Sequence, residues 1–273
     1  MSIRPLESSE DFKAFEDLQR KVWGQDLAEV VTSSLAQIVQ KIGGIAAGAF
    51  DAHGVMVGLV FGFTGFKDGR PVHWSYMLAV KNSIRDAGIG KKLKLYQRAI
   101  LLQGGDKEVF WTYDPLVARN AHLNFNSLGI EVSEYVADMY GPGEDSELFR
   151  GIGTDRFIVV WRIDSHHVES ILTGKSPTAI SPFAESPLAV SRIDSLATLS
   201  APQTANALRS SYIRIEIPLD IHVVRDASPA IAAEWRQATR HAFQQYLALG
   251  YQVSGFYRDE KTDRCFYCLR AQR

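Results

Sequence analysis

A glycine-bearing loop between a strand and a helix is the feature that most constrains the fold of this 273-residue chain. Apolar and aromatic residues predict a strand at Val72–Val80, and helical spacing resumes from about Ile89 to Gln103. The first amides of a helix have no partner inside the helix, and the helix dipole adds positive potential there. The loop therefore predicts a site for an anion, in particular a pyrophosphate.

The residues of this loop support a phosphate site. Gly88 and Gly90 let the backbone turn tightly and approach a ligand without a Cβ in the way. Arg85, Lys91 and Lys92 place formal positive charge around the same loop. The spacing fits neither the Rossmann fingerprint nor a Walker loop, and a plain tight turn remains the alternative.

The order of elements around the loop is that of an α/β (α+β) chain. Gly129 is placed to end a helix, and Ser228 and Pro229 suit the start of another. The expected strands and helices run in chain order as Ile3–Leu6, a helix from Ser9 to Gly24, a helix at Leu27–Ile42, strands at Gly44–Phe50, Val55–Phe63 and Val72–Val80, the helix at 89–103, a strand at Glu108–Tyr113, a helix at Leu116–Leu128, strands at Glu131–Tyr140, Phe157–Ile163 and Ile213–Ile217, a helix at Pro229–Leu249, and strands at Val253–Arg258 and Cys265–Leu269.

Composition divides the chain into three parts. Residues 1–164 hold the glycine loop, residues 165–211 are rich in Ser, Ala, Thr and Pro and predict a linker or wrapping segment, and residues 212–273 form a C-terminal extension. The order strand, helix, Leu-Gly, strand, Asp-Arg, strand occurs at 108–163 and again at 213–270. This weak repeat predicts that the extension is an α/β half-domain without a glycine loop.

With these residues in view, the sequence resembles the GNAT superfamily of acyltransferases over about residues 1–163. Leu78 and Val80 match the strand that precedes the family's motif, and Arg85, Gly88 and Gly90 match Gln/Arg-x-x-Gly-x-Gly/Ala. Leu128-Gly129-Ile130 is similar to the family's helix-closing Leu-Gly-Phe. The resemblance implies a GNAT-like mixed, mostly antiparallel sheet flanked by helices. A narrower likeness is to predicted acetyltransferases that carry a C-terminal extension.

The resemblance also implies how acetyl-CoA, or another acyl-CoA, would bind. The diphosphate would lie on the amides of the loop, the pantetheine arm would pair with the preceding strand, and the thioester would sit where this strand and the next one splay apart. The residues expected to bind the cofactor are Leu78, Ala79, Val80, Arg85, Asp86, Ala87, Gly88, Ile89, Gly90, Lys91 and Asn120.

The catalytic residues are less defined, because Phe125 stands where family members often have a tyrosine that protonates the thiolate. Tyr113 and Tyr140 are the substitutes that we expect, with packing as their alternative role. Asp114 is the first choice of base for the amine, although Asp-Pro also opens turns. The remaining candidates are His73 and His122 for proton transfer and the pair Arg236 and Arg240, either for an acceptor carboxylate or as a solvated helix face.

The predicted activity is acyl transfer from acyl-CoA to the amine of a small molecule, by direct attack in a ternary complex. Transfer to a hydroxyl group is not excluded. The alternative is a catalytically inactive CoA-binding sensor or interaction module, which Phe125 favours.

The net charge of −1 predicts no binding to nucleic acid. The sequence contains no run of about 18 apolar residues, so no membrane span is expected. The N-terminus resembles no signal peptide, so a cytoplasmic location is expected. Cys265 and Cys268 are too few for a structural zinc site, and no metal is expected. A homodimer is compatible with the apolar extension.

Overall fold

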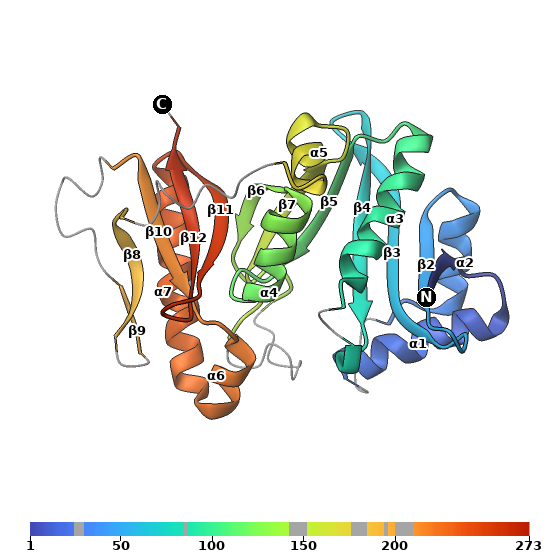
Figure 1. Ribbon diagram of the computed structural model, residues 1–273, viewed down its shortest axis with the longest axis horizontal. Coiled ribbons are helices and arrows are strands. Elements are labelled where there is room, and N and C mark those ends of the chain that lie inside the picture. Colours follow the sequence, from blue (N-terminus) through green and yellow to red (C-terminus); the bar gives the residue numbers. More distant parts are fainter. Residues whose placement is uncertain are drawn as a thin grey trace. The chain divides into compact units, whose positions relative to one another are not determined.

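The computed structural model describes residues 1–24, 30–84, 87–141, 152–175, 185–193, 196–199 and 210–272 (Figure 1). The chain forms two compact units, the first made of Met1–Trp111 and Trp161–Ser165, the second of Thr112–Val160 and His166–Arg273. Its strands form a seven-stranded sheet of order β1-β2-β3-β4-β5-β7-β6 and a five-stranded sheet of order β11-β12-β10-β8-β9. Most pairs are antiparallel, which confirms the predicted fold class.

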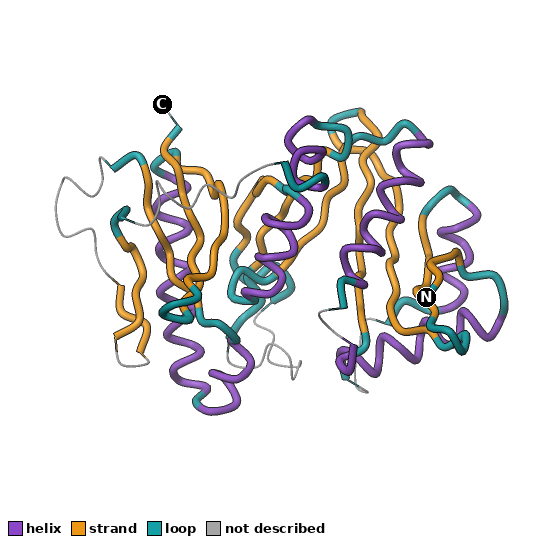
Figure 2. The backbone as a smooth tube through the Cα atoms, viewed as in Figure 1, coloured by secondary structure: helices purple, strands orange, loops and turns teal. Residues whose placement is uncertain are grey.

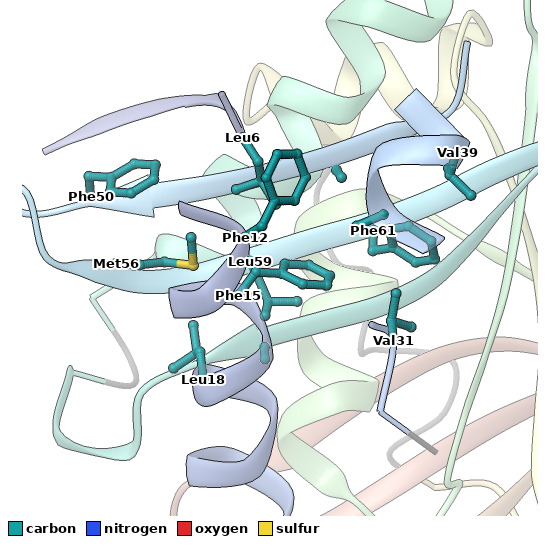
Figure 3. Packing of buried hydrophobic residues seen from close by; sticks show 13 residues of the cluster. Leu6, Phe12, Phe15, Leu18, Val31, Val39, Phe50, Met56, Leu59 and Phe61 are labelled. Atoms are coloured by element: carbon teal, nitrogen blue, oxygen red, sulfur yellow. The ribbon is translucent and has the colours of Figure 1, made fainter. Parts of the chain in front are cut away.

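The first unit is a sheet with helices on both faces. Leu59 and Phe61 point to one face and pack in a core with Phe12, Phe15 and other residues under α1 and α2 (Figure 3). The capping box that starts α1 uses Ser8, directly before Ser9, where the sequence predicts the helix to begin. The elements are β1 (Ser2–Pro5), α1 (Ser9–Trp23), α2 (Ser33–Lys41), β2 (Ile45–Phe50), β3 (Met56–Lys67), β4 (Arg70–Val80), the 3-10 turn η1 (Asn82–Ile84), α3 (Ile89–Gly104) and β5 (Glu108–Tyr113), whose last two residues belong to the second unit.

Helix α3 covers the opposite face of this sheet because small residues make room for it (Figure 1). A Cβ on Gly58 would come within 3.0 Å of Leu93 Cδ1 and 3.2 Å of Ile89 Cγ2. Gly58 therefore allows the first turns of α3 to lie close against β3. This contact positions the N-terminus of α3, which carries the glycine loop.

Strand β4 is irregular at two points that concern the site. Its register with β3 shifts where Phe61 pairs with Met77 and Gly62 pairs with Ser75, so Tyr76 is an extra, bulged residue. Its parallel ladder with β5 contains the pairs His73–Val109 and Trp74–Phe110, and the next residues, Ser75 and Trp111, form no such pair.

The second unit contains the five-stranded sheet and the remaining helices (Figure 2). Helix α7 begins with Ser228 as the N-cap and Pro229 in the first turn, as predicted. The elements are α4 (Ala118–Ala121), the π-helix η2 (His122–Leu128), β6 (Glu131–Val136), β7 (Arg156–Arg162), whose last two residues belong to the first unit, α5 (His166–Leu172), β8 (Leu188–Ile193), β9 (Leu196–Leu199), β10 (Tyr212–Ile217), α6 (Ile221–Ala227), α7 (Pro229–Ala248), β11 (Tyr251–Asp259) and β12 (Arg264–Ala271).

The two halves of the weak sequence repeat have the same strand order. In the first segment the order is β5-β7-β6, and in the second it is β10-β12-β11. In both, the third strand of the segment lies between the first and the second. The helices of both segments also end at a glycine in the left-handed conformation, Gly129 with φ 73° and Gly250 with φ 84°.

The segment expected to be a linker holds regular structure in its described parts. Helix α5 buries Val168, and β8 pairs in parallel with β10 through Leu188 and Val190. Short apolar runs among Ser and Pro residues supply these elements, and composition averaged over the segment hides them. Residues 176–184 and 200–209 lie outside the described residues. Among the helices that the structure describes, none is long and apolar enough to cross a bilayer.

Candidate functional site

The N-terminus of α3 is open to solvent where the sequence predicts the diphosphate. Gly88 is the N-cap residue, with φ 71° in the left-handed region, and apart from its chain neighbours no atom of the described residues lies within 4 Å of where its Cβ would stand. Lys92 N–H donates to Gly88 O at 3.1 Å, so the amides of Ile89, Gly90 and Lys91 precede the first complete helical turn. Ala87 and Gly88 are exposed, and Arg85 and Asp86 lie outside the described residues.

The end of β4 leads directly to this loop. Leu78, Ala79 and Val80 pair with Val60, Leu59 and Gly58 of β3 on one edge of the strand. No other residue in the described part of the chain pairs with them. An extended amide-bearing ligand can therefore add to the second edge.

A small apolar pocket lies beside the bulge of β4. Its volume is about 180 Å³. The Tyr76 ring is 39% exposed and packs against Phe61 and Phe63, with centroid separations of 6.3 and 6.2 Å. The described residues that line it carry no charge and are Val30, Val31, Leu35, Val39, Phe61, Phe63 and Tyr76.

The described contacts of Tyr113 and Asp114 are interior contacts of the second unit. Tyr113 is 5% exposed, its hydroxyl lies 3.3 Å from that of Tyr267, and burial raises its pKa. Asp114 accepts hydrogen bonds from Leu116 N–H at 2.8 Å and from Arg236 Nη2 at 2.6 Å. Arg156 Nη1 lies 3.7 Å from the same carboxylate. These contacts occupy the carboxylate of Asp114 within the interior of the second unit.

Tyr140 and Asn120 are more accessible. Tyr140 is 49% exposed, and its hydroxyl lies 3.1 Å from Thr112 Oγ1, near the end of β5. Asn120 is half-buried on α4, and its side-chain amide has no hydrogen-bond partner among the described residues. Both side chains are thus available to a ligand within the second unit.

The position usually held by the tyrosine acid belongs to the core. Phe125 is 7% exposed on the π-helix, and its ring packs edge-on against Tyr267 with centroids 6.0 Å apart. Of the two histidine candidates for proton transfer, His122 is exposed and forms a hydrogen bond with Asn126, whereas His73 is fully buried. The sequence offered no reason to separate these two histidines by burial.

The arginine pair of α7 is a structural feature of the second unit. Arg236 is 3% exposed and also donates to Ile152 O at 2.6 Å, and its Nη1 has no hydrogen-bond partner among the described residues. Arg240 donates from Nε to Asp155 at 2.9 Å and from Nη2 to Asp138 at 2.8 Å. Arg236 is buried and Arg240 is half-buried, so the pair is not the solvated helix face that was one of the two expectations. Arg236 binds Asp114, Arg240 binds Asp138 and Asp155, and pairings over these sequence distances have no local signal.

Comparisons with known proteins find likenesses in structure. The ribosomal-protein-S18-alanine N-acetyltransferase from Escherichia coli is 17% identical, with a TM-score of 0.47, over 60% of this chain and 94% of that one. An aminoglycoside 6'-acetyltransferase type Ii is 17% identical, with a TM-score of 0.48, over 61% of this chain and 99% of that one. An acetyltransferase of the GNAT family from Streptococcus pneumoniae is 14% identical, with a TM-score of 0.47, over 58% of this chain and 96% of that one. Neither a protein-family model nor a curated protein sequence matches the chain.

Proposed function

We propose that this protein is a GNAT-type acyltransferase that binds acetyl-CoA, or a related acyl-CoA, and transfers the acyl group to an amine. The observation that carries the proposal is the open N-terminus of α3. Gly88 leaves free space at the exposed start of the helix, directly after β4. Helix amides that face outward at such a point favour a doubly charged diphosphate.

In this proposal the cofactor lies along residues of the first unit. The diphosphate contacts the amides of Ile89, Gly90 and Lys91, and the pantetheine arm pairs with Leu78–Val80. Strand residues advance about 3.3 Å each, so the arm, running back along β4, brings the thioester about four residues or 13 Å from Val80, near the bulge at Tyr76.

The transfer needs no covalent enzyme intermediate. The amine nitrogen forms a bond to the thioester carbon, the carbon–sulfur bond breaks, and the thiolate takes up a proton while the amine loses one. Of the two candidate acids, Tyr113 and Tyr140, we propose Tyr140, because it is the exposed one. We assign no proton transfer to Asp114, whose carboxylate is bound by Arg236, or to buried Tyr113. Ordered water then accepts the proton of the amine.

The apolar pocket suggests the chemical class of the acceptor. It lies around Tyr76, where the thioester is proposed to end, and its lining among the described residues carries no charge. Its 180 Å³ is smaller than the 300–1,000 Å³ typical of sites for drug-sized ligands. We propose that it takes an apolar group about the size of an amino-acid side chain, next to the reacting amine.

The test combines calorimetry with thiol release. Acetyl-CoA is titrated into the protein, and free CoA thiol is then measured with a panel of primary amines that carry apolar, acidic or basic substituents. Binding together with turnover of apolar amines is expected. Absence of acetyl-CoA binding would refute the proposal, and turnover of acidic or basic amines alone would refute the acceptor class.

A CoA-binding sensor or interaction module is the second candidate. Phe125 favours it, since this position carries no hydroxyl and is packed against Tyr267. Tight acetyl-CoA binding without thiol release over the whole panel would select this candidate.

A further inference from the structure

A buried lysine lies at the point where β4 and β5 stop pairing. The last ladder pair is Trp74–Phe110, and Ser75 and Trp111 are the next residues of the two strands. We call these two residues the fork. Lys94 of α3 contacts both, since its Nζ donates to Ser75 Oγ at 2.8 Å and lies 3.6 Å from the centroid of the Trp111 ring.

Two hydrogen bonds and one ring contact surround the Lys94 amine. Besides the bond to Ser75 Oγ, Nζ donates to Gln97 Oε1 at 3.2 Å. The side chain is 2% exposed, and within the described residues no carboxylate pairs with it. Burial lowers the pKa of this lysine well below its ordinary value. A buried amine without a counter-ion is costly, and a methionine would fill the same space at lower cost.

The network continues behind Lys94 and fixes its position. Gln97 Nε2 donates to His73 Nε2 at 3.0 Å, and the other ring nitrogen of His73 bonds to Thr64 Oγ1 at 3.2 Å. Gly62 leaves room for this network, because a Cβ there would stand 2.4 Å from His73 Nε2. The amine is thus held from α3, β3 and β4 together.

We propose that Lys94 is a positioning residue that sets the separation of β4 and β5 at the fork and thereby places the acyl thioester. The inference rests on the proposed function, which puts the thioester in the space between these strands. Lys94 lies on the same helix as the proposed diphosphate site, five residues after Ile89. A single rigid helix then fixes both ends of the bound pantetheine arm.

The test replaces Lys94 by methionine, which keeps the buried stem and removes the donors. In Lys94→Met, kcat is expected to fall at least tenfold while the Kd of acetyl-CoA stays within about threefold, because the diphosphate contacts are unchanged. Ser75→Ala is a milder second variant that removes one contact of the fork. If the two residues act together, the double variant loses no more kcat than Lys94→Met alone. An unchanged kcat in Lys94→Met would overturn the inference.

Leu101→Ala is the matched control. Leu101 is 2% exposed on the same helix, so its truncation also lowers the melting temperature. Well below that temperature it is expected to leave kcat and KM unchanged, and an equal loss of kcat in this control would mean that Lys94 is only structural.

Hydrogen exchange on the CoA-free proteins decides the inference even if the wild type shows no turnover. Lys94→Met is expected to reduce protection at least tenfold in peptides covering Ser75–Val80 and Trp111, beyond any change in Leu101→Ala. Unchanged protection there would overturn the role of Lys94. Absence of acetyl-CoA binding by the wild type would refute the proposed function and the placing of the thioester, and the exchange result would then decide only whether Lys94 sets the separation of β4 and β5.

Discussion

The substitution Gly88→Val tests the proposed diphosphate site with a calculable cost to the fold. Gly88 has φ 71°, a conformation that costs a non-glycine residue about 1–3 kcal/mol, with a β-branched residue toward the upper value. The new Cβ meets no atom of the described residues within 4 Å, so these residues add no steric clash to this strain. For a chain of this size, we expect the melting temperature to fall by about 2–4 °C for each kcal/mol.

The effect on ligand binding should be larger. The valine side chain would occupy the space in front of the amides of Ile89 and Gly90. Each hydrogen bond from an amide to a charged phosphate contributes about 1.5–3 kcal/mol, so loss of two removes about 3–6 kcal/mol. Since 1.4 kcal/mol corresponds to a tenfold change, the affinity for acetyl-CoA should fall at least about 100-fold.

The other end of the same helix supplies the control. Gly105 is the C-cap of α3, has φ 85°, and also has no atom within 4 Å of its Cβ position. Gly105→Val should therefore lose similar stability and retain acetyl-CoA binding. Calorimetry gives the affinities and thermal melting the stabilities. The reasoning fails if Gly88→Val binds acetyl-CoA within about threefold of the wild type, or if both variants lose binding equally.

Three further predictions concern single side chains. Burial, and then the charge of Lys94, lower the pKa of His73 from 6.5 to about 4. As the pH falls from 6.5 to 4, the imidazole is therefore protonated in the unfolded chain before it is protonated in the folded protein. At about 1.4 kcal/mol per pH unit, denaturant melts should show a loss of about 3 kcal/mol of stability between pH 6.5 and 4 that is absent from the His73→Leu variant. Tyr140→Phe should lower kcat about 100-fold in the thiol-release assay with an unchanged Kd for acetyl-CoA, and an unchanged kcat would assign the proton to water. Asp114→Asn should lower the free energy of unfolding by about 3–5 kcal/mol because it leaves Arg236 and Arg156 without their carboxylate. A loss of activity at unchanged stability would instead restore Asp114 as the base.

Elements whose boundaries depend on local chemistry were predictable from the sequence. Strand β5 spans Glu108–Tyr113, and α7 starts after Ser228, both as expected. The helix predicted at 116–128 begins two residues later and becomes a π-helix from His122. The choice between α and π hydrogen bonding depends on packing, which residue spacing does not report. Strands β8 and β9 were not predicted, because their apolar runs are short and lie among Ser and Pro residues.

The site was predictable where it depends on backbone and unpredictable where it depends on partners distant in sequence. Glycine at position 88 indicated the open helix end, since a left-handed N-cap suits that residue. The ion pair of Asp114 joins residues 122 positions apart, and no pattern predicts it. The burial of Lys94 was predictable in part. The buried residues Ile89, Leu93, Gln97 and Leu101 recur every four residues along α3, and Lys94 lies beside this stripe. The spacing therefore indicates that Lys94 is close to the buried face of the helix.

Phe125, which stands where a tyrosine acid is expected, has a structural reason that bears on the source of the proton. A tyrosine hydroxyl at Phe125 would enter an interior where Tyr267 already uses its hydroxyl to bond Pro115 O at 2.8 Å. A buried hydroxyl without a partner costs about 1–3 kcal/mol, so phenylalanine is the residue that this core favours. The C-terminal strand β12, which carries Tyr267, thus stabilises the second unit at the position where a proton donor would otherwise be expected. If the protein turns over acetyl-CoA, the proton must come from an exposed group such as Tyr140 or from water, and the pH dependence of kcat in Tyr140→Phe separates these two sources.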